Sequence, residues 1–281
     1  MSSIHYEVKG EGNPVILIHG FCETSAIWKP LLNKLAFSHK VITLDLPGFG
    51  KSPLPKTPFS IADIAEEVYR WMKENQLLGS VVIGHSLGGY VSLALAEKYP
   101  ESIKGFGLFH STAFADDDEK KHSRNKTIAF VRKRGVKVFA DSFVSQLFYL
   151  KNRERLAGAI AEVTVDAGNT NEETLIAYME AMRDRPDRTD VLKSFNGPIL
   201  FIAGDQDTSV PFEKSQAQFE LMQQPYLTIL KEVGHVGMYE ATSESYEAIT
   251  KFLNAFEEDS TDDIQTGILP DRDLKKNLGC G

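Results

Sequence analysis

The stretch Gly84–Gly89 (GHSLGG) limits the possible folds of this chain more than any other part of the sequence. It follows an apolar run, Val81–Ile83, and precedes an Ala/Leu-rich segment, Tyr90–Tyr99, that predicts a helix. A Gly-x-Ser-x-Gly sequence between a strand and a helix is typical of a nucleophile elbow, in which two glycines permit a tight turn that exposes a serine hydroxyl. We therefore take Ser86 as a candidate nucleophile and look for a base, an acid and a scaffold elsewhere in the chain.

Short apolar runs and amphipathic segments alternate along most of the chain. The first segment, Ile4–Val8, alternates apolar and polar residues and predicts an edge strand. Buried strands are predicted at residues 15–18, 41–44, 81–83, 103–109, 199–202 and 227–230. Helices are predicted at about residues 25–36, 61–77, 90–99, 212–222 and 243–256. This alternation predicts an α/β fold with a mostly parallel, twisted sheet that is flanked by helices.

The alternation is interrupted between residues 113 and 190, where no run resembles a strand. Charged amphipathic stretches lie there around residues 126–139, 153–165 and 173–182. We expect residues 113–190 to form a helical cap over the carboxyl edge of the sheet, inserted into a core made of residues 1–112 and 191–256. Residues 257–281 begin with an acidic run and are expected to form a flexible tail or a short docking segment.

Composition and charge argue against several classes of function. The 281 residues carry 31 Lys and Arg against 39 Asp and Glu, and the resulting net charge of −8 disfavours nucleic acid as a partner. The two cysteines, Cys22 and Cys280, match no metal-ligand spacing, so we expect neither a metal site nor a disulfide framework. No stretch reaches the roughly 18 consecutive apolar residues of a membrane span, and the N-terminus lacks signal-peptide features. We therefore expect a cytoplasmic protein whose oligomeric state the sequence leaves open.

A candidate base and a candidate acid follow the last two predicted strands. His235 lies in the loop after the last strand and is the only one of the seven histidines that is C-terminal to both the elbow and the acid. The acid is one of two aspartates, Asp205 or Asp207, in the loop after the preceding strand. We favour Asp207, which lies deeper in the loop, and expect Asp205 to brace the turn. Both partners are needed because a free serine is a weak nucleophile.

Other motifs have simpler interpretations. The segment Asp45–Ser52 resembles a phosphate-binding loop, but Asp45 stands where the first glycine of that motif is required, so we expect a turn stabilised by this aspartate. Cys22 is expected to be a small packed residue rather than a reactive thiol. His110 and Ser111 end a predicted strand and are candidates for the wall of a substrate pocket.

Taken together, the motifs resemble those of the α/β-hydrolase superfamily. The features that carry the resemblance are the chain order Ser86, Asp207, His235, the His19-Gly20 loop, the Asp45–Ser52 segment and the elbow. Within the superfamily the sequence is similar to small bacterial serine hydrolases with a cap, which include lipase-like esterases, enol-lactonases and carbon–carbon bond hydrolases. The resemblance covers about residues 4–256, and the expected fold has about eight strands with a helical cap inserted after the sixth strand.

The resemblance also implies a set of roles. Ser86 would be the nucleophile, Asp207 the acid and His235 the base, while the backbone N–H groups of Phe21 and Leu87 would form an oxyanion hole. No metal and no organic cofactor would be needed. The expected reaction is hydrolysis of a small to medium carboxylic ester or lactone through an acyl-enzyme. The alternatives are hydrolysis of a carbon–carbon bond in a diketone, and a slow-turnover ligand receptor on the same scaffold.

Overall fold

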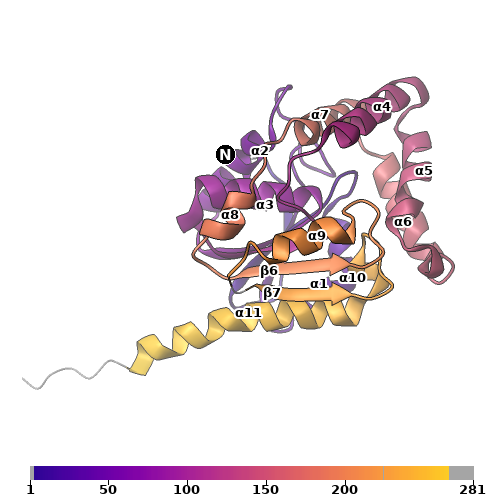
Figure 1. Cartoon of the computed structure of the whole chain (residues 1–281). Helices are drawn as coiled ribbons and strands as arrows, with labels where there is room; N and C mark the ends of the chain where they lie inside the picture. Colours follow the sequence, from indigo (N-terminus) through magenta and orange to yellow (C-terminus); the bar gives the residue numbers. More distant parts are fainter. Residues whose placement is uncertain (1–2, 224, 266–281) are drawn as a thin grey trace, which may run out of the picture.

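A central sheet organises the chain in the computed structural model, which describes residues 3–223 and 225–265 (Figure 1). Over these residues the sheet has seven strands in the order β1-β3-β2-β4-β5-β6-β7. The strands are β1 (Tyr6–Lys9), β2 (Pro14–Ile18), β3 (Lys40–Leu44), β4 (Ser80–His85), β5 (Ile103–Phe109), β6 (Ile199–Gly204) and β7 (Tyr226–Leu230). Only β1 is antiparallel to its neighbour, and every other pair is parallel. The predicted α/β architecture is therefore confirmed.

The register of the sheet brings the ends of the parallel strands together. At the end of β2, Ile18 pairs with Gly84 of β4, and Gly84 pairs in turn with Leu108 of β5. Phe109 pairs with Ile202 of β6. The loops that follow these strands consequently leave the sheet along one edge, which is where ligands bind in open α/β sheets.

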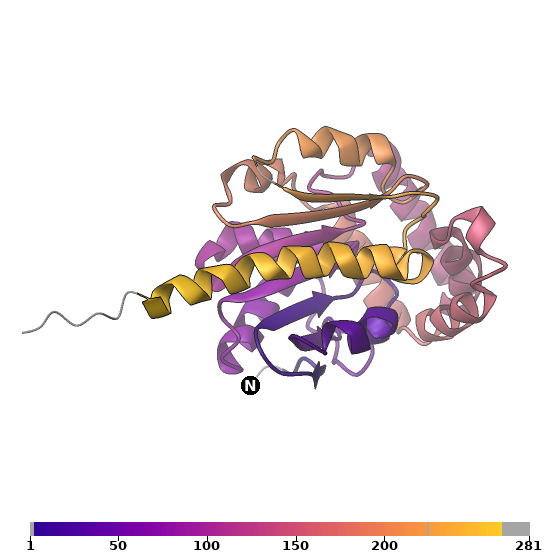
Figure 2. The same cartoon turned by 90° about the horizontal axis from the view of Figure 1, so that it is seen from below.

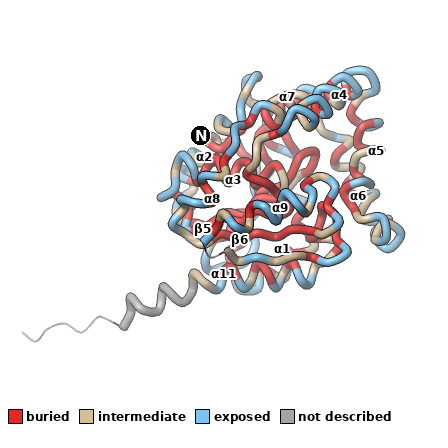
Figure 3. Tube along the Cα trace, in the orientation of Figure 1, coloured by how far each residue is buried: buried red, intermediate tan, exposed pale blue. Residues whose placement is uncertain are grey.

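Helices cover both faces of the sheet. The helices of the core are η1 (Ser25–Trp28), α1 (Lys29–Leu35), α2 (Ile61–Glu74), α3 (Leu87–Lys98), η2 (Pro100–Ser102), α8 (Thr189–Ser194), α9 (Phe212–Phe219), α10 (Gly237–Glu240) and α11 (Thr242–Gln265). α1 and α11 lie together on one face, whereas α2, α3, α8 and α9 lie on the other (Figures 1 and 2). The five central strands, β2 to β6, are almost wholly buried, whereas the edge strands β1 and β7 are more exposed (Figure 3). This coverage explains why the central strands are continuous apolar runs.

Local sequence signals explain where individual core elements begin and turn. Ser60 and Asp63 form the capping box expected at the start of α2, with Asp63 N–H donating to Ser60 Oγ over 3.2 Å and Ser60 N–H donating to Asp63 Oδ2 over 2.8 Å. After β3, the Asp45 carboxylate accepts the backbone N–H groups of Ser25 and Lys51 at 2.8 and 3.0 Å. Asp45 thus stabilises a turn, as the sequence predicts.

The segment between β5 and β6 consists of helices and the loops that join them. It contains α4 (Asp118–Arg134), α5 (Val136–Leu147), η3 (Leu150–Asn152), α6 (Ala157–Gly168) and α7 (Glu172–Arg183). The arrowheads of β6 and β7 point toward α5 and α6, so these helices lie beyond the carboxyl edge of the sheet (Figure 1). We call residues 113–190 the cap segment and propose it as a separate unit; α8 crosses its predicted end at residue 190.

Two details of the predicted topology are wrong for the described residues. The sheet has seven strands rather than about eight, and the cap segment follows the fifth strand rather than the sixth. Both differences have one cause. The count of about eight comes with the resemblance, whereas the strand signals of this sequence, one edge strand and six buried runs, number seven and place the cap segment after the fifth.

The end of the last helix also differs from the prediction. α11 continues to Gln265, past the expected end at residue 256, so the proposed tail at 257–281 begins as helix. The acidic run contains no Gly or Pro before Gly267, and Glu, Asp, Ser and Thr do not by themselves end a helix. Residues 266–281, with the remainder of the predicted tail and Cys280, lie outside the described residues. Among the helices that the structure describes, none has the length and apolar character to cross a bilayer.

Candidate active site

Ser86 lies at the turn between β4 and α3 and has a strained backbone, with φ 49° and ψ −110°. Its N–H donates to the carbonyl oxygen of Phe109 over 3.0 Å, which holds the turn against β5. The flanking glycines have no room for a side chain. A Cβ on Gly84 would lie 2.1 Å from the carbonyl carbon of Gly88, and a Cβ on Gly88 would lie 2.4 Å from the carbonyl oxygen of Ile18. The two glycines are therefore a steric requirement of the elbow.

His235 and Asp207 meet at the same edge of the sheet. His235 Nδ1 lies 2.7 Å from Asp207 Oδ2, and both side chains are buried. The other oxygen of Asp207 accepts the N–H groups of Ser209 and Val210 at 2.8 and 2.9 Å. Burial alone would raise the pKa of the Asp207 carboxyl, but the charge of His235 and hydrogen bonds hold that pKa well below its usual range. The carboxylate therefore accepts the Nδ1 proton, which leaves Nε2 of His235 free.

Asp205 has a different role in the same loop. Its Oδ1 accepts the N–H of Glu232 over 2.7 Å, and its Oδ2 lies 3.7 Å from Lys231 Nζ. These contacts join the loop after β6 to the loop after β7. The structure thus has Asp207 against the histidine and Asp205 bracing the turn, in the arrangement expected from the sequence.

The base loop is attached to the elbow through the residue before the candidate nucleophile. His85 Nε2 lies 2.8 Å from the carbonyl oxygen of His235, and the centroids of the two imidazole rings are 5.0 Å apart. Ser86 follows His85 directly in the chain, so this bond joins the base loop to the backbone next to the candidate nucleophile. Among the described residues its hydroxyl makes no hydrogen bond, which is common for a nucleophile without substrate.

The loop after β2 lies across the start of α3. A Cβ on Gly88 would be 2.8 Å from the carbonyl oxygen of His19, which shows how closely the two backbones approach. Phe21 lies in this loop, and Leu87 is the first residue of α3. The side chain of His19 holds this loop through both of its ring nitrogens. His19 Nδ1 lies 2.7 Å from the carbonyl oxygen of Gly20, and its Nε2 accepts the N–H of Leu46 over 2.9 Å, so this imidazole is neutral.

Comparison with known proteins agrees with this geometry. Residues 13–242 match the model of a protein family described as the alpha/beta hydrolase fold. The chain belongs to the α/β-hydrolase family. Over 241 residues it is 28% identical to Lipase 3 of Moraxella sp. (strain TA144), a match that covers 83% of this chain and 75% of the lipase.

Solved structures give the same picture of this α/β-hydrolase. A thermophilic esterase from Thermogutta terrifontis superposes with a TM-score of 0.85 at 27% identity, covering 90% of this chain and 93% of the esterase. The enol-lactonase from Burkholderia xenovorans LB400 has a TM-score of 0.82 at 21% identity, covering 89% of this chain and 96% of the lactonase, and this likeness concerns the fold alone.

A second acid–histidine pair, which the sequence analysis does not identify, lies beneath the site of this α/β-hydrolase. Glu23 Oε2 lies 2.9 Å from His85 Nδ1 and accepts the N–H of Gly20 over 2.7 Å. Glu23 is 4% exposed and His85 is fully buried. The only local signals are the position of His85 inside the elbow and of Glu23 just after the His19-Gly20 loop, and neither predicts the pairing of residues so distant in sequence.

His110 and Ser111 lie under the site rather than on a pocket wall. His110 Nε2 accepts the N–H of Gly237 over 3.2 Å, so its proton is on Nδ1, which lies 3.3 Å from Asp207 Oδ2 in a poorly aligned contact. Burial lowers the pKa of His110 to about 4, which keeps the ring neutral. Ser111 Oγ donates to the carbonyl oxygen of Ser86 over 2.7 Å. Both residues are buried, because the strand that they end is central in the sheet.

The structure also brings together one group of potential metal ligands. In the part of the chain that it describes, His110, Asp207 and His235 present ligand atoms within 4.8 Å of one another. In both histidines, however, the nitrogen nearest the carboxylate is Nδ1, which carries the ring proton, and only that of His235 is hydrogen-bonded to Asp207. The arrangement fits a hydrogen-bonded acid with two histidines better than a set of lone pairs directed at an ion.

The cap segment covers the site from above. Phe21 contacts the rings of Phe139 and Phe143 from α5, with centroids 6.3 and 6.1 Å away. The backbone N–H of His235 donates to the carbonyl oxygen of Leu147 over 2.7 Å. On the other side, α7 is tied to the loop after β3 because the Tyr178 hydroxyl donates to the carbonyl oxygen of Pro47 over 2.8 Å.

Glu240 fastens the base loop to the cap segment. One oxygen of this buried carboxylate accepts the N–H of Gly234 over 2.9 Å. The other accepts the N–H of Tyr149 and the side-chain amide of Asn152, both over 2.8 Å. The position of His235 therefore depends on the cap segment as well as on the core.

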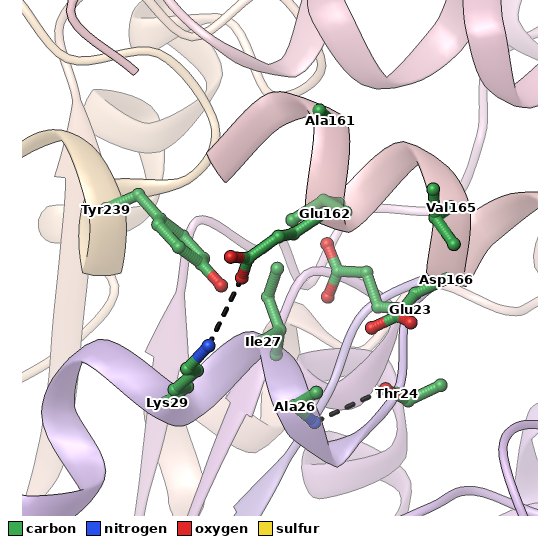
Figure 4. A pocket seen from close by; sticks show the side chains of 11 residues that line it. Glu23, Thr24, Ala26, Ile27, Lys29, Ala161, Glu162, Val165, Asp166 and Tyr239 are labelled. Atoms are coloured by element: carbon green, nitrogen blue, oxygen red, sulfur yellow. Dashed lines mark hydrogen bonds and ion pairs between the residues drawn. The ribbon is translucent and has the colours of Figure 1, made fainter. Parts of the chain in front are cut away.

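A cavity of about 470 Å³ adjoins the site between η1, α1 and α6 (Figure 4). Glu162 of α6 and Lys29 of α1 reach toward each other across it and form an exposed ion pair of 3.3 Å. Glu23 and Tyr239 also line this cavity (Figure 4). Ser86, Asp207 and His235 do not line it, so the cavity lies beside the candidate triad and does not contain it.

Proposed function

We propose that this protein is a serine hydrolase that cleaves a small to medium carboxylic ester or lactone through an acyl-enzyme at Ser86. The observation that carries the proposal is the convergence of Ser86, Asp207 and His235 at one sheet edge, with a bond of 2.7 Å between the acid and the base. The names of two relatives, a lipase and an esterase, support an ester as the substrate.

The proposed reaction begins with attack of the Ser86 hydroxyl on the substrate carbonyl. His235 accepts the hydroxyl proton at Nε2, and the Asp207 carboxylate stabilises the resulting imidazolium through Nδ1. The tetrahedral oxyanion accepts the backbone N–H groups of Phe21 and Leu87, each contributing roughly 3 kcal/mol of transition-state stabilisation. His235 then returns the proton to the leaving alkoxide, and an acyl-enzyme remains on Ser86. Attack by a water molecule, activated by the same histidine, releases the acid.

Burial of the site supports a water-poor reaction environment. Asp207, His235 and Phe21 are each at most 6% exposed, and Leu87 is fully buried. Hydrogen bonds to a developing charge contribute more where water is excluded. The aromatic contacts of Phe21 with the cap segment favour an apolar acyl group at this position.

Burst kinetics test the proposal. With an aryl ester, wild type should release about one equivalent of phenol before the steady state, because acylation precedes a slower hydrolysis of the acyl-enzyme. Ser86→Ala should abolish the burst and lower kcat by about a thousandfold or more. A panel of esters and lactones of increasing acyl length would define the substrate range. Unchanged turnover in Ser86→Ala would refute the proposal, and faster turnover of a vinylogous diketone than of any ester would favour carbon–carbon bond hydrolysis.

A further inference from the structure

The imidazole of His85 has a hydrogen-bond acceptor at each of its two nitrogens. Nδ1 faces the carboxylate of Glu23 at 2.9 Å, and Nε2 faces the carbonyl oxygen of His235 at 2.8 Å. A neutral imidazole carries one proton and cannot donate to both. A carbonyl oxygen cannot donate, and Glu23 Oε2 already accepts the N–H of Gly20. All of these contacts are satisfied when His85 is doubly protonated and Glu23 is ionised.

The geometry points to Glu23 and His85 as positioning residues: a buried, permanently charged pair that fixes the catalytic histidine and the oxyanion loop relative to each other. This inference rests on the proposed function, because it takes His235 as the catalytic base and the loop after β2 as the source of an oxyanion donor. The links run from Gly20 through Glu23 and His85 to the backbone of His235, at 2.7, 2.9 and 2.8 Å. The loop after β2 and the loop after β7 are thereby joined by one continuous chain of hydrogen bonds.

Charge balance explains why an ion pair is suited to this place. The ring of His235 becomes positive during the reaction, only 5.0 Å from the ring of His85. A lone cation at His85 would oppose that change, whereas the carboxylate of Glu23 makes the pair neutral as a whole. Burial lowers the pKa of His85, but Glu23 outweighs burial and raises it; conversely the charge of His85 holds the pKa of Glu23 below its usual range despite burial.

Other titratable groups lie close enough to influence the pair. They are those of His19, Cys22, His110, Asp207, His235 and Tyr239. His19 and His110 are neutral by their hydrogen bonds, and burial raises the pKa of the Cys22 thiol to about 12. Asp207 is thus the second anion near His85, and it is engaged by His235.

Nuclear magnetic resonance of ¹⁵N-labelled histidine tests the charged pair without any substrate. Wild type should show protons on both ring nitrogens of His85 from about pH 6 to 8, a range over which an ordinary histidine loses one. The signal is assigned by its loss in His85→Gln. In Glu23→Gln, His85 should retain a single ring proton at pH 8. A single ring proton in wild type at pH 8 would overturn the inference.

Kinetics test the positioning role. Glu23→Gln is nearly isosteric and should lower kcat by about 10- to 100-fold with little change in KM, because base and oxyanion donors lose their alignment. His85→Gln should lower kcat similarly, and the double variant should cost no more than either single one, because the two residues act as a unit. Unchanged kcat in Glu23→Gln, or fully additive losses, would contradict the role.

Asp116→Asn is the matched control. Asp116 is an equally buried carboxylate that binds Arg124 and Arg185 at the base of the cap segment, outside the candidate triad. Replacing this carboxylate by an amide should lower the stability of the fold but leave kcat unchanged. If wild type hydrolyses no ester, the proposed function fails while the resonance measurement still decides the charge of the pair. If wild type hydrolyses esters and Glu23→Gln is fully active, only the positioning role fails.

Discussion

Two buried acid–histidine pairs lie in contact in this molecule and are used differently. In Asp207–His235, one ring nitrogen is bound to the acid and the other is left free. In Glu23–His85, both ring nitrogens face acceptors. The first histidine therefore has a free nitrogen that can accept a proton, as the proposed reaction requires, whereas the second has none. A carboxylate beside an imidazole thus gives a base in one pair and a fixed charge in the other. The difference is the carbonyl oxygen of His235, which lies against the second nitrogen of His85.

The comparison also distinguishes how each pair is anchored. The Asp207–His235 pair connects the loops after β6 and β7 and is tied through Leu147 and Glu240 to the cap segment. The Glu23–His85 pair connects the loop after β2 with the elbow, inside the core. A substrate that moves the cap segment would consequently disturb the first pair more than the second.

The largest expected effect comes from the acid of the first pair. Asp207→Asn should lower kcat by about 10³- to 10⁴-fold, because an amide does not hold the reactive tautomer of His235. Asp205→Asn, in the same loop, should cost far less because Asp205 braces a turn. Steady-state kinetics of both variants on one aryl ester make the measurement. Equal losses in the two variants would assign the wrong acid.

A smaller effect is expected from the neutral histidine next to the first pair. His110→Gln should lower kcat by about two- to tenfold, since its contact with Asp207 is long and Asp207 keeps the N–H groups of Ser209 and Val210. The same assay measures this loss. A decrease in kcat as large as that of Asp207→Asn would show that His110 takes part in proton transfer together with His235.

The two pairs should also differ in how their contribution to stability changes with pH, and we expect this difference to appear as a modest shift in melting temperature. The lowered pKa values of Asp207 and Glu23 mean that their contribution is present above the ordinary carboxyl range and is lost as pH falls through the folded-state values. The raised pKa of His85 means that its contribution is present at low pH and is lost as pH rises through the folded-state value. Burial lowers the pKa of His110 to about 4, so the folded protein also loses stability through this residue as pH falls below about 6.

Thermal melts from about pH 2 to 10 measure this dependence, at roughly 2–4 °C for each kcal/mol. Asp207→Asn should flatten only the acid side of the profile, whereas Glu23→Gln should flatten both sides. An alkaline side that is identical in wild type and Glu23→Gln would mean that His85 is not charged in the folded protein.

Much of the fold could be predicted because it depends on local signals. Continuous apolar runs mark the buried parallel strands, and the Ser60/Asp63 capping box marks the start of α2. Ser86, Asp207 and His235 could be predicted as candidates because each follows a strand, and the ends of parallel strands share one edge. The local strand signals also number seven, as in the structure, and the expectation of about eight strands comes from the resemblance.

The supporting part of the site could not be predicted from the sequence. The pairing of Glu23 with His85 depends on the exact approach of the loop after β2 to the elbow, which tertiary packing determines. The prediction that His110 lines a pocket wall rests on its position at the end of a strand, where a side chain can face either outward or into the layer beneath. The sequence contains no signal that distinguishes these two orientations.

The central claim is that Ser86 is the nucleophile of a covalent reaction, and labelling tests it most directly. Wild type is treated with a serine-directed fluorophosphonate and analysed by intact-mass spectrometry, with Ser86→Ala as the control. The account predicts one phosphonyl adduct on wild type, located on the peptide that contains Ser86, and none on the variant. An adduct of equal yield on Ser86→Ala, or ester turnover by a wild-type enzyme that the reagent neither labels nor inhibits, would contradict it.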